Sequence, residues 1–268
     1  MTFNHGHRGE GSRAMITVSN VSKTFPTKEG PREVLLPVDL RIEKGEFVAF
    51  VGPSGCGKST LLNMIGGLIT PSTGVISHQG INVTRPNTNV GYMTQAESLL
   101  PWRTAFENVE LPLKLRGAQP TKRRKRVEQL LASVGLSDFA KSYPNELSGG
   151  MRKRVALAQV LAYDPETILM DEPFGALDAQ LKMVMQNEIL QLHEASHKTF
   201  VFVTHDLSEA IALADRIIIF SARPGHIKAE RSIPLSRPRD VFRARFHSEF
   251  QEIYEDLWNQ LAPEISTN

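Results

Sequence analysis

The segment from Gly52 to Thr60, with the sequence GPSGCGKST, contains the residue types that bind a phosphate chain. A glycine, four further residues and then Gly-Lys-Ser stand between an apolar strand-like run and a helix-like run, as a phosphate-binding loop requires. Glycines let consecutive backbone N–H groups curve around phosphate oxygens, Lys58 brings a positive charge, and the Ser59 hydroxyl can bind Mg²⁺. The segment predicts a nucleoside triphosphate site lined by Gly52, Pro53, Ser54, Gly55, Cys56, Gly57, Lys58, Ser59 and Thr60.

Two acidic residues, Asp171 and Glu172, directly follow the apolar run 167–170. A carboxylate at the end of a buried strand can fix Mg²⁺ opposite Ser59, and its neighbour can orient and deprotonate an attacking water. Two adjacent acids at a strand end more often form a solvated turn, but a phosphate loop in the same chain favours the functional interpretation. We therefore expect Asp171 to be a metal ligand and Glu172 to be a general base.

Four near-continuous apolar runs must position these residues: 47–51, 167–170, 200–204 and 217–220. Such runs, separated by helical segments, are typical of a parallel sheet that is covered on both faces. Chemistry collects at the carboxyl ends of the strands in sheets of this kind. We therefore expect the phosphate loop, Asp171, Glu172 and His205 to lie at one edge of the sheet.

Two alternating segments, 16–25 and 34–42, predict an antiparallel β layer before the phosphate loop, with a turn over 26–31 between them. From Ser98 the pattern becomes helical, which predicts an inserted α-helical subdomain over about 98–162. The predicted fold is α/β, with a P-loop NTPase core that contains a mixed or parallel sheet, an N-terminal antiparallel β layer and the helical insertion.

The composition is that of an ordinary globular protein. The 268 residues include 31 basic and 29 acidic side chains, a balance too even to indicate a nucleic-acid or anionic-membrane surface over the whole molecule. The single cysteine excludes an internal disulfide framework and fits a reducing compartment. No run approaches the roughly 18 apolar residues of a membrane span, so work at a membrane would require a partner.

The run Leu147-Ser148-Gly149-Gly150, together with Gln95, residues 176–178 and His205, closely resembles the ATP-binding subunits of ABC transporters. The resemblance covers roughly residues 15–235. It implies an ATPase that uses ATP and Mg²⁺ and works as a head-to-tail homodimer, in which each ATP lies between one phosphate loop and the other copy's Leu-Ser-Gly-Gly signature. The residues agree with this, because Ser148, Gly149 and Gly150 begin a predicted helix, and a helix N-terminus is an anion site.

The same resemblance assigns roles to individual residues. Lys58, Ser59 and Thr60 would hold phosphate and metal, and Gln95 would sense both the metal and the membrane partner. Glu172 would be the general base. Further roles would fall to four residues: Asp171 as the Walker B aspartate, Asp178 at the dimer interface, His205 against the γ-phosphate and Phe25 stacked on adenine. Met151 departs from the glutamine that the family commonly has after the two glycines, so interface contacts beyond Gly150 are expected to differ.

Residues 97–102 and 222–225 resemble those of importer subunits for nitrate, sulfonates and taurine. That resemblance implies a small anionic solute, a membrane-spanning permease, an extracytoplasmic solute-binding protein and a peripheral location on the cytoplasmic face of the membrane. The apolar cluster from Leu99 to Trp102 would contact the permease. The alternative is a soluble ABC-type ATPase switch in nucleic-acid or protein assembly. Such proteins commonly carry two cassettes or a long coiled coil, whereas this chain has one phosphate loop and no heptad array, so no nucleic-acid partner is expected.

Three segments are predicted along the chain: a flexible leader at 1–14, an ABC ATPase domain at 15–236 and a C-terminal helical extension at 237–268. In the extension, apolar residues recur on one helical stripe: Phe242, Phe246, Phe250, Ile253, Leu257 and Leu261. Such a helix would pack on its own subunit. A role in regulation or in dimer contact is the alternative.

Overall fold

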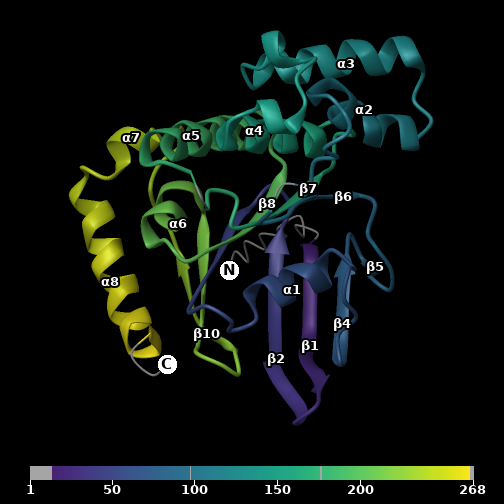
Figure 1. Cartoon of the computed structure of the whole chain (residues 1–268). Coiled ribbons are helices and arrows are strands. Elements are labelled where there is room, and N and C mark those ends of the chain that lie inside the picture. Colours follow the sequence, from purple (N-terminus) through teal and green to yellow (C-terminus); the bar gives the residue numbers. More distant parts are fainter. Residues whose placement is uncertain (1–13, 97, 176, 266–268) are drawn as a thin grey trace, which may run out of the picture.

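The computed structural model describes residues 14–96, 98–175 and 177–265 (Figure 1). The predicted leader at 1–14 lies outside these residues, apart from Ala14, and so do Glu97 and Ala176. The described chain forms two β-sheets, a group of helices above them in the view of Figure 1 and a helical C-terminal segment at one side.

The N-terminal sheet is antiparallel, with strand order β2-β1-β4-β5. Its strands are β1 (Ala14–Thr27), β2 (Gly30–Glu43), β4 (Thr73–His78) and β5 (Ile81–Asn82). The expected turn over 26–31 is too long, because Pro26 pairs with Pro31 and only Lys28 and Glu29 lie between the two strands. Gly30 makes this tight connection possible, since it adopts a φ of 117°.

The second sheet has the strand order β10-β9-β3-β8-β7-β6. In that order its strands are β10 (Ile227–Ser232), β9 (Arg216–Phe220), β3 (Phe47–Val51), β8 (Thr199–Thr204), β7 (Thr167–Asp171) and β6 (Val90–Met93). Every neighbouring pair from β9 to β6 is parallel, and β10 is an antiparallel edge strand. The carboxyl ends of β3, β8, β7 and β6 therefore lie side by side, as the apolar runs predict.

Helices α1 (Lys58–Ile65), α5 (Ala179–Ser196) and α6 (Leu207–Leu213) follow β3, β7 and β8. Between β6 and β7 lies the helical insertion, formed by α2 (Ala105–Leu115), α3 (Pro120–Ser133) and α4 (Gly149–Leu161). It begins with a capping box, in which Thr104 and Glu107 each bind the other's backbone N–H. Within the described ranges no helix is both long enough and apolar enough to cross a membrane.

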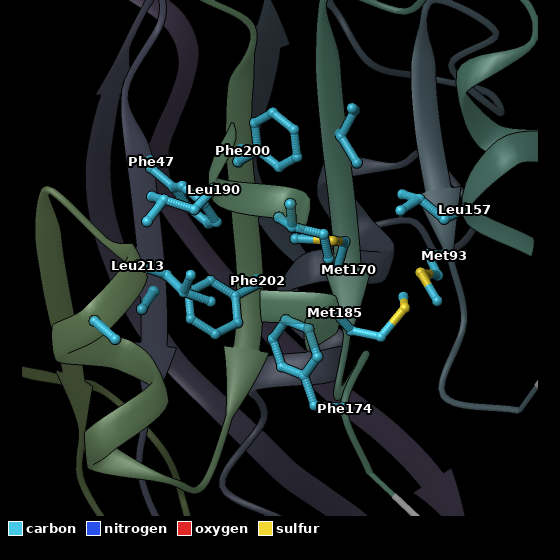
Figure 2. Packing of buried hydrophobic residues seen from close by; sticks show 14 of the residues in the cluster. Phe47, Met93, Leu157, Met170, Phe174, Met185, Leu190, Phe200, Phe202 and Leu213 are labelled. Atoms are coloured by element: carbon cyan, nitrogen blue, oxygen red, sulfur yellow. The ribbon is translucent and has the colours of Figure 1, made fainter. Parts of the chain in front are cut away.

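The second sheet is buried on both faces. Alternate residues of β3 belong to two different apolar clusters, one on each side of the sheet, because successive strand side chains point to opposite faces. Figure 2 shows one of these clusters, where Phe47 and Phe202 pack with Leu190 and Met185 of α5. The rings of Phe47 and Phe202 meet edge to face, with centroids 5.4 Å apart. This core fixes the sheet edge that carries the candidate site.

The C-terminal segment forms two helices, α7 (Val241–Ala244) and α8 (Ser248–Ile265). The expected single stripe is wrong at its start, because Phe242 and Phe246 are 43% and 85% exposed. The chain turns between the two helices, so the helical spacing does not continue across 245–247. The remaining apolar residues of the stripe are buried: Phe250, Ile253, Leu257 and Leu261. They belong to the same cluster as α6, against which α8 packs.

Candidate nucleotide-binding site

The phosphate loop connects β3 to α1, and its shape depends on glycine. Gly55 and Gly57 have φ values of 75° and 102°, a region that residues with a Cβ rarely adopt. Lys58 is only 5% exposed, and its Nζ donates to the carbonyl oxygens of Gly52 and Pro53, at 2.7 Å each. Among the described residues no carboxylate forms an ion pair with this buried ammonium group. Its charge is therefore available to an anion that enters the loop.

Ser59 and Asp171 are in direct contact although 112 residues separate them, and Ser59 Oγ donates to Asp171 Oδ1 at 2.7 Å. Asp171 ends β7, two strands from β3, so parallel pairing brings the two residues together. Burial raises the pKa of Asp171, and the nearby Glu172 carboxylate adds to the rise, whereas the Ser59 hydrogen bond and Lys58 oppose it.

These two side chains fit a magnesium ion that is shared with a nucleotide. A hydroxyl and a carboxylate are oxygen ligands of the kind Mg²⁺ prefers, and Mg²⁺ usually completes its octahedron with phosphate oxygens and water. In the part of the chain that the structure describes, no group of three or more His, Cys, Asp or Glu side chains could hold a metal ion. The donor set thus matches a site that the triphosphate itself completes.

Glu172 lies between Gln95 and His205. Its Oε2 accepts a hydrogen bond from Nε2 of Gln95 at 3.0 Å, and its Oε1 is 3.5 Å from Nδ1 of His205. The three residues follow β6, β7 and β8, so neighbouring strand ends bring them together. Glu172 has a φ of 45°, uncommon for a residue with a side chain, and its N–H donates to Val203 O at 3.0 Å. Its side chain is 26% exposed, which lets a water molecule reach it.

The signature residues lie on another part of the molecule. Ser148 is the N-cap of α4, its side chain is exposed, and its Oγ accepts a hydrogen bond from Met151 N at 3.3 Å. Gly149 and Gly150 are the first residues of α4, where backbone N–H groups lack partners within the helix. Figure 1 shows α4 in the helical insertion, away from α1 and the phosphate loop. One copy of the chain therefore does not bring the signature to its own Lys58.

Phe25 and Asp178, also predicted from the sequence, form no hydrogen bond or ion pair with Asp171 or Glu172 within the described residues. Asp178 is exposed and caps α5, where its Oδ1 accepts hydrogen bonds from the N–H groups of Gln180 and Leu181 at 3.1 and 2.9 Å. Phe25 is partly buried on β1, and Nζ of Lys23 lies 4.9 Å from the centroid of its ring. Both side chains are accessible to a ligand or to a second protein copy.

Several residues that support the site are not evident from the sequence. Lys153 of α4 is 3% exposed, and its Nζ donates to the backbone oxygen of Gln95 at 2.6 Å. Glu209 of α6 accepts a hydrogen bond from Thr204 at 2.5 Å and forms an ion pair of 2.7 Å with Lys182 of α5. Lys153 stands between Arg152 and Arg154 in a basic run, so its residue type gave no local signal for its contact with Gln95. The contacts of Glu209 with Thr204 and Lys182 also gave no local signal, because the three residues lie on different elements.

Comparisons with known proteins agree with this geometry. The ABC transporter family matches residues 35–175. The bicarbonate transport ATP-binding protein CmpD of Synechocystis sp. is 44% identical over 230 residues, 85% of this chain and 82% of that protein. The aliphatic sulfonates import ATP-binding protein SsuB of Bacillus cereus is 40% identical over 247 residues, 91% of this chain and 95% of that protein.

A solved structure extends the comparison to the fold. The dimeric post-hydrolysis state of the ATP-binding cassette MJ0796 bound to ADP and Pi has a TM-score of 0.75 and 38% identity. The match covers 83% of this chain and all of that chain. The fold class, the ATPase activity and the family expected from the sequence are confirmed. The chain belongs to the ABC transporter family, as an ATP-binding subunit with ATPase activity.

Proposed function

We propose that this chain energises an importer for a small anionic solute and works as a head-to-tail homodimer. The proposal rests on the fact that the residues of the candidate site lie in two separate places of one chain. Lys58 and the carboxylates gather at one sheet edge, whereas Ser148 begins a helix elsewhere and exposes its side chain. A second copy of the chain could supply that helix start. The dimeric relative that is bound to ADP and Pi supports this arrangement.

The first part of the proposal concerns ATP binding. The N–H groups of the phosphate loop, Lys58 and Thr60 hold the phosphates, and Phe25 stacks on adenine. Ser59 and Asp171 hold Mg²⁺, which neutralises phosphate charge when it is bound. The contact between Ser59 and Asp171 supports these two roles, because it places both oxygens at one point.

The second part concerns hydrolysis. Glu172 takes a proton from the attacking water, and its hydrogen bond with Gln95 orients the carboxylate. Gln95, which follows β6, also contacts the metal and connects the site to the permease. His205 contacts the γ-phosphate and stabilises the charge that develops there. The 3.5 Å approach of His205 to Glu172 supports a shared task for these residues.

The third part concerns the partner copy. Ser148, Gly149 and Gly150 bind the γ-phosphate from the opposite subunit, because a helix N-terminus offers free N–H groups and a positive dipole end. Asp178 contacts the same subunit interface. Hydrolysis is then weak in a monomer and rises with protein concentration or when the permease holds two copies together.

The fourth part concerns transport. Two of the similar proteins are named for bicarbonate transport and for the import of aliphatic sulfonates, and nitrate shares with these solutes a negative charge spread over oxygens. Such solutes, delivered by an extracytoplasmic binding protein, are the cargo we propose. Trp102 is 70% exposed and stands seven residues after Gln95 in the sequence, and we assign it to a contact with a membrane-spanning permease. The chain would then sit peripherally on the cytoplasmic face of that membrane.

A complementation experiment tests the composite site. Lys58→Ala removes the ammonium group from one half of each site, and Ser148→Arg blocks the other half. Each variant alone should be inactive. When the two are mixed in equal amounts and allowed to exchange, half of the dimers contain one intact site, so about a quarter of the wild-type ATPase rate should return. A mixture no more active than its components, under conditions where exchange is demonstrated, would contradict the head-to-tail dimer.

Transport needs a separate measurement. The chain is co-expressed with a permease that co-purifies with it and with a solute-binding protein, and ATP-dependent uptake of bicarbonate, nitrate and an alkyl sulfonate is measured in vesicles. We expect uptake of one of these anions, and Glu172→Gln should abolish it. Co-purification with nucleic acid in place of a permease would favour the soluble ATPase switch instead.

A further inference from the structure

The connection between β9 and β10 contacts the phosphate loop. Its residues 222–225 took no part in the chemistry proposed above. Nε of Arg223 donates a hydrogen bond to the backbone oxygen of Gly55 at 2.9 Å. A Cβ added to Gly55 would clash with an Nη atom of the same guanidinium group. The arginine therefore lies directly against the middle of the phosphate loop.

Gly225 makes the second contact of this turn. Its N–H donates a hydrogen bond to Val34 O at 3.0 Å, and its oxygen accepts one from Leu36 N at 2.8 Å. These two hydrogen bonds fix the turn to β2. A Cβ added to Gly225 would overlap the backbone oxygen of Cys56. The turn thus packs its backbone against the loop at Cys56, a side chain that is fully buried.

These two contacts determine where the amide groups of the loop point. In a planar trans peptide, the C=O of one residue and the N–H of the next point in opposite directions. The oxygen of Gly55 faces Arg223, so the N–H of Cys56 points away from Arg223. The contact of Gly225 with the oxygen of Cys56 orients the N–H of Gly57 in the same way. In phosphate loops, consecutive N–H groups that point to a common side bind the anion.

Helix α8 holds the turn from its other side. Glu264, near the end of α8, accepts a hydrogen bond from Ala222 N at 2.8 Å and pairs with Lys228 Nζ at 2.7 Å. Lys228 also donates to the backbone oxygen of Gln260 at 2.9 Å. Two hydrogen bonds, joined by the peptide link between Ala222 and Arg223, therefore connect α8 to Gly55.

We propose that Arg223 is a positioning residue that orients the phosphate loop for ATP, and that α8 supports it through Glu264. The C-terminal extension then acts on nucleotide affinity without touching the nucleotide. The proposal rests on the proposed function only in that the loop binds ATP. The orientation of the empty loop can be measured without any nucleotide.

Cys56 supplies that measurement, because it is the single cysteine of the chain and lies beneath the turn. Its labelling by N-ethylmaleimide, followed by intact mass spectrometry in the absence of nucleotide, reports how often the loop opens. Arg223→Ala and Glu264→Ala should each accelerate labelling by about three- to tenfold, since each removes a charge-assisted hydrogen bond. The matched control is Arg231→Ala, which removes a 3.4 Å ion pair between β10 and Asp256 of α8 away from the loop. It should label at the wild-type rate.

ATP titrations of the same full-length variants give the second readout. Arg223→Ala and Glu264→Ala should raise the KM for ATP by about three- to tenfold and leave kcat within about twofold, as expected when binding alone is weakened. Unchanged labelling and KM in Arg223→Ala would overturn the proposal, and so would an equal effect of Arg231→Ala, which would indicate general loosening of α8. If the wild-type chain failed to bind ATP, the proposed function would fail, while the labelling rates would still decide whether Arg223 orients the loop.

Discussion

Replacing Glu209 with glutamine would remove the charge from a buried carboxylate that connects two helices. The Glu209 side chain is 5% exposed, accepts the hydrogen bond of Thr204 and forms the 2.7 Å ion pair with Lys182. Glutamine keeps the size and one acceptor oxygen, but it loses the ionic partner of Lys182. Thr204 precedes His205, and Lys182 lies on α5, the helix that Asp178 caps. The change therefore also weakens the contacts that hold His205 and the start of α5 in place.

The expected loss follows from these contacts. A hydrogen bond to a charged group contributes about 1.5–3 kcal/mol, and removing one partner of a fully buried ion pair costs about 3–5 kcal/mol. Lys182 is 26% exposed and keeps Asp206 at 3.6 Å, so water and a second carboxylate compensate in part. We therefore expect Glu209→Gln to lower the free energy of unfolding by about 2 kcal/mol.

Urea unfolding at pH 7, followed by circular dichroism, measures this loss. The matched control is Glu128→Gln, which breaks an exposed 2.9 Å pair with Arg124 on α3, where the glutamate side chain is 56% exposed. That loss should stay below about 0.5 kcal/mol. Equal losses for the two variants, or a loss below about 0.5 kcal/mol for Glu209→Gln, would refute the reasoning from burial.

Three further predictions concern the nucleotide and pH. Glu172→Gln should lower kcat about 10²–10⁴-fold through loss of the general base while ATP affinity stays within about threefold, measured by single-turnover hydrolysis and equilibrium binding; an unchanged kcat would exclude Glu172 as the base. Phe25→Ala should weaken ATP binding about tenfold and Phe25→Tyr should not, as calorimetry would show, and equal affinities would remove the stacking role. Burial lowers the pKa of His78 from 6.5, against the opposing effect of Glu166. Its contribution to stability is therefore fully present above pH 6.5 and is lost as the pH falls toward and through the folded pKa, so acid unfolding profiles of His78→Gln should be flatter than those of the wild type.

Much of the fold could be predicted because its signals are local. The apolar runs 47–51 and 200–204 are too continuous for a half-exposed strand, and both became central strands of the parallel sheet. The phosphate loop was evident for the same reason, since Gly55 and Gly57 supply backbone conformations that other residues rarely adopt. Errors arose where a local pattern competed with tertiary packing. Phe246 keeps the helical spacing of its neighbours, yet the chain turns at that point and leaves it exposed.

The candidate site divides in the same way. Residue types and order alone indicated Lys58, Asp171 and Glu172, because each belongs to a short motif with its own chemistry. The tertiary structure decided which of them meet: parallel strand ends bring Ser59 to Asp171 and Gln95 to Glu172, whereas Ser148 stays on a separate helix.

The sequence by itself determined that this chain has a phosphate loop followed by a helix. The residues that form this motif are adjacent in the chain, and their types decide which backbone conformations the loop can adopt. Only the tertiary structure decided what holds that loop in place. Arg223 and Gly55 are 168 residues apart, and Glu264 lies a further 42 residues from Ala222. Contacts over such separations depend on the order of the strands in the sheet and on where α8 packs. They cannot be predicted from the local spacing of residue types.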